Sequence, residues 1–165
     1  GWRRALIVSI ALNLGAAALV FCGAGAVAAA GITLPAKYDP LHRLRGWRGL
    51  GQQVGAELAA HPGLTLLADD RELLAALIYY VRPHPLGAVH WSVIPGIKDQ
   101  WLLENGIEKH RGENFLAVTV STPFAQLRPN FAELVPLTTI TTATGPGGGR
   151  TYTLYIARDY RGPPR

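Results

Sequence analysis

The hydrophobic and polar positions divide the chain into an apolar N-terminal run and a longer region of mixed character. Residues 5–32 are almost all Ala, Leu, Val, Ile, Gly and Phe, and no charged residue lies between Arg4 and Lys37. A helix of about 20 apolar residues crosses the core of a bilayer. The run therefore predicts a transmembrane helix with short flanks over residues 1–36, followed by a soluble domain over residues 37–165.

A secretory signal peptide is the alternative interpretation of this run. Arg3 and Arg4, the apolar core and the small residues Ala26-Val27-Ala28 have the order of a signal and its cleavage site. The apolar core of a signal is only about 7–15 residues long, and Gly1 is not expected to be a translation start, because the chain has no Met. A membrane helix is therefore favoured. The small residues at positions 23–31 predict close packing against further helices of a larger protein.

The sequence after the apolar run predicts an α/β domain. Asp39-Pro40 is a typical helix start, and the apolar positions from Leu41 to Leu58 recur at three- and four-residue spacing up to the break at His61-Pro62-Gly63. A second helix is predicted over about residues 71–81. The predicted strands are residues 64–68, 88–93, 115–120, 134–142 and 151–157. Residues 122–130 predict a loop with room for one helical turn, and residues 95–112 have no clear pattern.

The order of these segments favours one arrangement of the sheet. Strands that alternate with helices predict a small, mostly parallel sheet covered by helices. The last two predicted strands are rich in Thr and Tyr and are joined by the glycine-rich residues 145–149, which predicts a C-terminal hairpin.

The net charge of +5 and the pI of about 9.7 bear on the partners. Nucleic acid is not expected, because no tract combines Lys and Arg with interleaved aromatic residues. The basic residues Lys37, Arg43, Arg45 and Arg48 instead follow the apolar run, and such a cluster is typical of contact with lipid phosphates, at roughly 1 kcal/mol per residue near an anionic surface. The alternative is that they are solvated residues of a helix face. Counted alone, these charges favour a cytoplasmic domain.

The sequence contains none of the usual motifs that would predict a catalytic or cofactor-binding site. Gly49-x-Gly51-x-x-x-Gly55 is similar to a dinucleotide-binding loop, but no strand precedes it, so we expect these glycines inside a helix. The histidines do not have the spacing of metal ligands, and the only cysteine, Cys22, lies in the apolar run. We expect no metal, no cofactor and no catalytic residue in this chain.

Polar residues gather where a predicted buried strand meets a helix. Asp69, Asp70 and Arg71 follow the strand of residues 64–68, and ligands of open α/β sheets bind outside the carboxyl ends of strands. One interpretation is a contact with substrate or with another domain, with Gln100 beside Trp101 as a second side of the site. The other is that the carboxylates cap the helix and form a surface ion pair.

These residues support a family resemblance. The strand followed by Ala68-Asp69-Asp70-Arg71, the helix ending in Tyr79-Tyr80 and the later Asp99-Gln100-Trp101 resemble the C-terminal region of bacterial membrane glycosyltransferases of the protein mannosyltransferase and aminoarabinose transferase superfamily. The segment Asp39-Pro40 to Arg45-Gly46-Trp47, which follows a last membrane helix, fits the same pattern. The resemblance covers most of the chain.

The resemblance implies a multi-span enzyme of the bacterial inner membrane. Such an enzyme moves a sugar from a polyprenyl-phosphate donor to a lipid, glycan or protein acceptor on the periplasmic side. The implied catalytic acid lies in an early loop that this sequence does not contain, so the implied role of residues 37–165 is to shape the acceptor side. This orientation is opposite to the one that the charge count favours.

Two other functions are consistent with the sequence. One is a singly anchored periplasmic domain that binds or senses a ligand without catalysis. The other is a structural subunit whose helix docks into a larger membrane complex.

Overall fold

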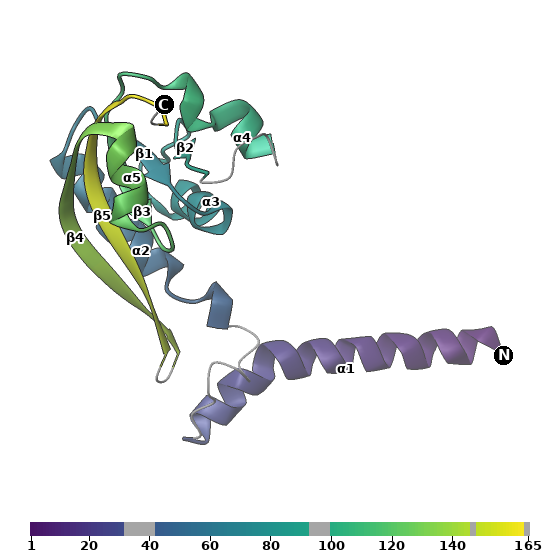
Figure 1. Cartoon of the computed structure of the whole chain (residues 1–165). Coiled ribbons are helices and arrows are strands. Elements are labelled where there is room, and N and C mark those ends of the chain that lie inside the picture. The colour runs from purple at the N-terminus through teal and green to yellow at the C-terminus, as the bar shows by residue number, and fades with distance from the viewer. Residues whose placement is uncertain (32–41, 93–99, 146–147, 164–165) are drawn as a thin grey trace. The chain divides into compact units, whose positions relative to one another are not determined.

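The computed structural model of the chain describes residues 1–31, 42–92, 100–145 and 148–163 (Figure 1). The predictions made for Lys37, for Asp39-Pro40 and for residues 95–99 lie outside the described residues. Two compact units are described separately: residues 1–45 with 143–149, and residues 46–142 with 150–165.

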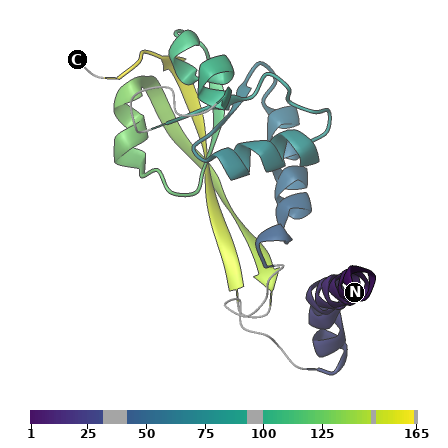
Figure 2. The same cartoon turned by 90° about the vertical axis from the view of Figure 1, so that its right-hand side faces the viewer.

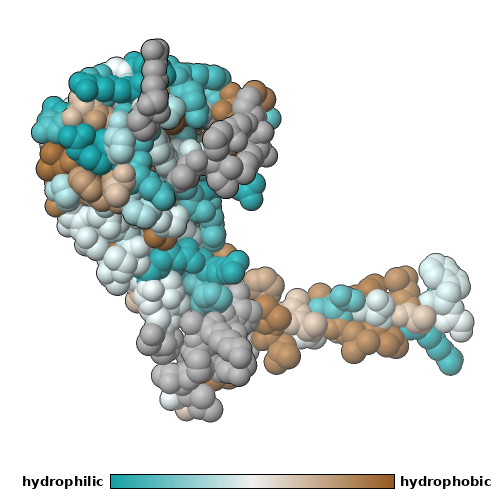
Figure 3. Space-filling model, viewed as in Figure 1, coloured by the Kyte–Doolittle hydropathy of each residue, from teal (hydrophilic) through white to brown (hydrophobic). Residues whose placement is uncertain are grey.

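The first unit contains the long apolar helix α1 (Trp2–Ala29). Its segment Trp2–Gly23 is long and apolar enough to cross a membrane, and hydrophobic side chains cover most of its visible surface (Figure 3). The polar residue Asn13 donates a hydrogen bond to the carbonyl oxygen of Ser9 at 2.8 Å. The helix therefore satisfies this side chain internally, as an apolar environment requires.

The second unit is built on a mixed five-stranded sheet. The strands are β1 (Thr65–Ala68), β2 (Val89–His90), β3 (Phe115–Thr119), β4 (Phe131–Gly145) and β5 (Gly148–Tyr160), in the order β2-β1-β3-β5-β4. β1 pairs in parallel with β2 and with β3, whereas β3 pairs with β5 in antiparallel register. The α/β class is confirmed, but a mostly parallel sheet is not the arrangement observed. The reason is that β5 returns along the sheet and inserts between β3 and β4.

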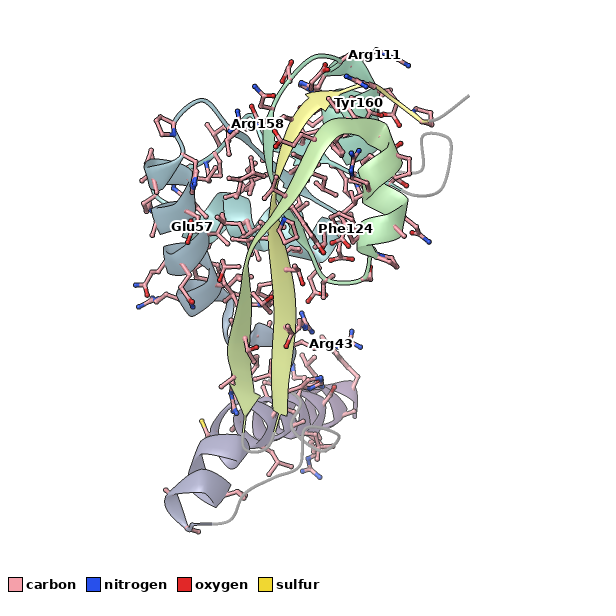
Figure 4. All side chains as sticks on the ribbon, turned by 60° about the vertical axis from the view of Figure 1, so that its left-hand side comes forward. Arg43, Glu57, Arg111, Phe124, Arg158 and Tyr160 are labelled. Atoms are coloured by element: carbon pink, nitrogen blue, oxygen red, sulfur yellow. The ribbon has the colours of Figure 1, made fainter. Side chains whose placement is uncertain are left out.

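Helices cover both faces of this sheet (Figure 2). On one face α2 (Trp47–Ala60) and α3 (Arg71–Tyr80) contribute Leu50, Val54, Leu73 and Leu77 to the larger buried cluster. A second cluster lies on the other face and includes residues of η3 (Ile107–Lys109) and α5 (Phe124–Leu127). Figure 4 shows Glu57 of α2 and Phe124 of α5 on opposite sides of the β4–β5 hairpin. Short segments η2 (His42–Leu44), α4 (Gln100–Asn105) and η4 (Arg128–Asn130) complete the elements.

Several element boundaries differ from the prediction. The single helix predicted to extend back to Leu41 is interrupted: Leu44 lies in η2 and is 66% exposed, and α2 begins only at Trp47. The reason is Gly46, whose φ of 87° is left-handed and ends any helix that approaches from the N-terminal side. β2 is only two residues long, and the hairpin strands extend beyond their predicted ends. The helix over residues 71–81 is confirmed as α3.

The glycines of α2 explain how the two covering helices pack. A Cβ placed on Gly51 would lie 2.5 Å from the Cβ of Tyr80 in α3, and one placed on Gly55 would lie 3.5 Å from Cγ1 of Val81. A Cβ on Gly49 would meet no atom within 4 Å. The motif that is similar to a nucleotide loop therefore serves close helix packing at two of its three glycines.

This packing gives a stability prediction. We expect Gly51→Ala to lower the free energy of unfolding by about 1–2 kcal/mol, because the clash of overpacking outweighs the gain in helix propensity. The melting temperature of the full chain in detergent micelles should fall by several degrees. Gly49→Ala is the matched control and should be neutral or stabilising by up to about 1 kcal/mol. Equal melting temperatures for the two variants would contradict the close approach.

Candidate functional site

Asp69 is a structural link between two strand ends. Its Oδ1 accepts a hydrogen bond from the backbone N–H of Val120 at 2.9 Å, and its Oδ2 accepts from the N–H groups of Ser121 at 3.0 Å and Thr122 at 2.7 Å. The Ser121 hydroxyl lies 3.4 Å from the same Oδ2. Because β1 and β3 are parallel neighbours, their carboxyl ends meet here, and the carboxylate closes the segment after β3 onto the segment after β1.

Asp70 and Arg71 have local positions. Asp70 is the N-cap of α3, and its Oδ1 accepts a hydrogen bond from the backbone N–H of Leu73 at 2.9 Å. Arg71 is the first residue of α3 and is exposed. The structure therefore brings the two aspartates together at the end of β1, where they already accept backbone hydrogen bonds. The capping interpretation describes Asp70, and Asp69 has a longer-range role that the sequence did not reveal.

The other predicted contact residues do not join this group. Gln100 opens α4, and its side-chain amide donates to the carboxylate of Glu104 one turn later. No hydrogen bond or ion pair described in the structure connects Gln100 to Asp69, Asp70 or Arg71. Arg43 and Arg45 are exposed residues of the first unit, whereas Arg48 is an exposed residue of α2 in the second unit.

A groove between α2 and the end of α3 is the candidate site that the structure adds. It has a volume of about 660 Å³. Gly51, where the backbone of α2 closely approaches Tyr80, is part of its lining. Its described lining residues are Arg48, Gly51, Gln52, Gly55, Ala56, Tyr79, Tyr80 and Arg82.

Arg82 is held in place at one wall of this groove. Its Nη1 donates to the carbonyl oxygen of Tyr79 and, at 2.9 Å, to that of Val81. Its guanidinium carbon lies 6.0 Å from the centroid of the Tyr79 ring. His84 lies beside it: its Nδ1 is 2.7 Å from the carbonyl oxygen of Ile78 and 3.0 Å from Nη1 of Arg82. A carbonyl only accepts, so the tautomer that donates from Nδ1 to Ile78 fits best. Arg82 and His84 thus cap the C-terminal end of α3.

A second cavity, of about 410 Å³, lies on the opposite face of the sheet and is lined in part by Trp91, Glu108, Asn130 and Tyr160. Burial raises the pKa of the Tyr160 phenol, and the charge of Glu108 adds to the rise while that of Arg111 opposes it. Figure 4 shows Tyr160 and Arg111 at the same end of the domain. The indole Nε1 of Trp91 has no hydrogen-bond partner among the described residues, but the nitrogen is itself buried. A ligand in the cavity would therefore not reach it without movement of the ring.

The described residues limit the chemistry of these sites. Among them, no three His, Cys, Asp or Glu side chains are grouped closely enough to hold a metal ion. The polar residues that line the groove are two cations, two phenols and an amide, which are groups that can form hydrogen bonds to a ligand. No protein-family model, curated protein or solved structure matches the chain.

The role of Asp69 gives a second prediction. Asp69→Asn replaces an acceptor of three backbone N–H groups by an amide with only one oxygen, so we expect the free energy of unfolding to fall by about 1–3 kcal/mol. Asp70→Asn is the matched control, because Asn caps a helix as well as Asp does. Thermal unfolding of the full chain in detergent measures both variants. Equal stability of Asp69→Asn and Asp70→Asn would show that the hydrogen bonds accepted by Asp69 do not stabilise the fold.

Proposed function

We propose that this chain is the C-terminal part of an integral-membrane glycosyltransferase that uses a sugar linked to polyprenyl phosphate. In this proposal the α/β domain shapes the acceptor side, and the chemistry takes place in a membrane region that precedes this sequence. The acceptor is a lipid, a glycan or a protein.

The order of elements is the observation that carries the proposal. A helix with the length and composition of a membrane span is followed by a domain in which Ala68-Asp69-Asp70-Arg71 joins a buried strand to a helix ending in Tyr79-Tyr80. This is the order on which the family resemblance rests. The structural roles of Asp69 and Asp70 are also consistent with a domain that does not itself supply a catalytic acid.

The proposal places the domain on the periplasmic side of a bacterial inner membrane. The basic residues Arg43, Arg45 and Arg48 would then lie near lipid phosphates of that surface, since residues 30–46 tether α2 to α1. The charge rule favours the opposite side, but it is not absolute for a helix that follows several others.

A singly anchored periplasmic module that binds a ligand without catalysis is the second candidate. The groove between α2 and α3 favours it, because such a groove needs no membrane region to form. The two candidates differ in what precedes the chain in the gene and in whether the whole protein transfers sugar.

The first test of the proposal combines the gene with an activity. We expect the coding sequence upstream of Gly1 to encode several hundred residues of hydrophobic spans with an acidic residue in an early extracytoplasmic loop. We expect the whole protein, but not residues 1–165 in detergent, to transfer sugar from a polyprenyl-phosphate donor. Sugar transfer by residues 1–165 alone, or a start codon a few residues before Gly1, would overturn the proposal.

The second test concerns the side of the membrane. The only native cysteine, Cys22, lies in α1, so Ala75→Cys on the exposed surface of α3 adds a single reporter thiol to the domain. A maleimide that does not cross the inner membrane should label this variant in intact cells, with the wild-type chain as the control for Cys22. Labelling only after lysis would place the domain in the cytoplasm.

A further inference from the structure

We infer that the groove between α2 and α3 is a binding site for a phosphate group, held between the guanidinium groups of Arg48 and Arg82. This assigns a ligand to the domain itself and does not require that the domain takes part in sugar transfer. The phosphate belongs either to a soluble phosphate compound or to a lipid headgroup.

The first step of the argument is the fixed position of Arg82. Its Nη1 donates to the carbonyl oxygens of Tyr79 and Val81, and the His84 ring lies beside it. The Nε and Nη2 of Arg82 donate no hydrogen bond to any described residue, which leaves one edge of the guanidinium fork for a ligand. A side chain that is already ordered loses less conformational entropy when it binds.

The second step is the opposite wall. Arg48, Gln52 and Ala56 follow one another at four-residue spacing, so they lie on one face of α2. All three line the groove, and Arg48 and Gln52 are exposed. Within the part of the chain that the structure describes, Arg48 forms no ion pair or hydrogen bond. The groove therefore has one guanidinium on α2, from Arg48, and one just after the end of α3, from Arg82.

The third step is the character of the ligand. None of the described lining residues is acidic, so both positive charges are available to an anion. A carboxylate is satisfied by one guanidinium fork, whereas a phosphate has a larger charge and more acceptor oxygens and matches donors from two sides. The phenol of Tyr79, which is 63% exposed beside Arg82, adds a further donor. A phosphate is therefore the ligand that uses all of these groups.

The lipid version of this inference rests on the membrane location in the proposed function, and the soluble version does not. Binding is measured without any sugar transfer. If the domain binds phosphate but the whole protein transfers no sugar, this inference holds and the proposed function fails. If the whole protein transfers sugar but the domain binds no phosphate, the proposed function holds and this inference fails.

The experiment uses the full chain in nanodiscs of phosphatidylcholine. In the first arm, inorganic diphosphate is titrated into the sample and its affinity is measured by calorimetry. In the second arm, phosphatidic acid is included in the nanodisc and the melting temperature of the protein is measured. A ligand that binds only the folded state raises the melting temperature. Binding of diphosphate identifies a soluble phosphate, whereas a higher melting temperature with phosphatidic acid and no binding of diphosphate identifies a headgroup.

Charge-matched variants test the site. Arg48→Gln should weaken diphosphate binding about tenfold or remove the stabilisation by phosphatidic acid, because a charge-assisted contact is lost. Arg71→Gln makes the same change of net charge at the other end of α3 and should have little effect. Arg82→Lys, which keeps the charge but not the fork, should also weaken binding. Absence of stabilisation in both arms, or equal losses in Arg48→Gln and Arg71→Gln, would overturn the inference.

Discussion

Strand β3 is buried along its whole length, and the placement of the covering elements follows from that constraint. Phe115 and Ala117 belong to the cluster on one face of the sheet, whereas Leu116 and Val118 belong to the cluster on the other. A strand that is apolar on both faces requires cover on both faces. The helices α2 and α3 supply one cover and the segments η3 and α5 contribute to the other (Figure 2). The groove lies between the two helices of the first cover, α2 and α3, which approach each other closely at Gly51.

The two aspartates after β1 accept backbone hydrogen bonds at an edge of the sheet where ligands of open α/β folds also bind. Parallel strands end at the same edge of the sheet, and the backbone N–H groups beyond them need acceptors if they are not solvated. Asp69 serves the segment after β3, and Asp70 serves the first turn of α3. The groove between α2 and α3 lies at the far end of α3, and there a cation, Arg82, is held by backbone carbonyl oxygens, whereas the two aspartates are held by backbone N–H groups.

Local sequence patterns predicted the elements well and their long-range relations less well. The break at His61-Pro62-Gly63 and the cap at Asp70 are local signals, and α2 and α3 end and begin there. The left-handed Gly46 was missed, because only the backbone conformation shows that this glycine is a break. The hairpin that contains β5 was predicted, but its pairing with β3 was missed, since nothing local records which second strand β5 joins. The sequence shows the spacing of Gly51 and Gly55, but it does not show which helix these glycines face, because that depends on the tertiary structure.

The insertion of β5 between β3 and β4 has a consequence for biosynthesis. Residues 115–119 pair with residues 153–157, so β3 lacks one of its two neighbours until a segment almost 40 residues later is available. While the chain leaves the ribosome, β1, β2 and β3 can associate, but one edge of β3 stays open and its apolar side chains are incompletely covered. An open apolar edge of this kind is a substrate for chaperones and a point of misassembly. The sheet of this domain is therefore completed late in synthesis, and the domain cannot fold strand by strand from its N-terminal side.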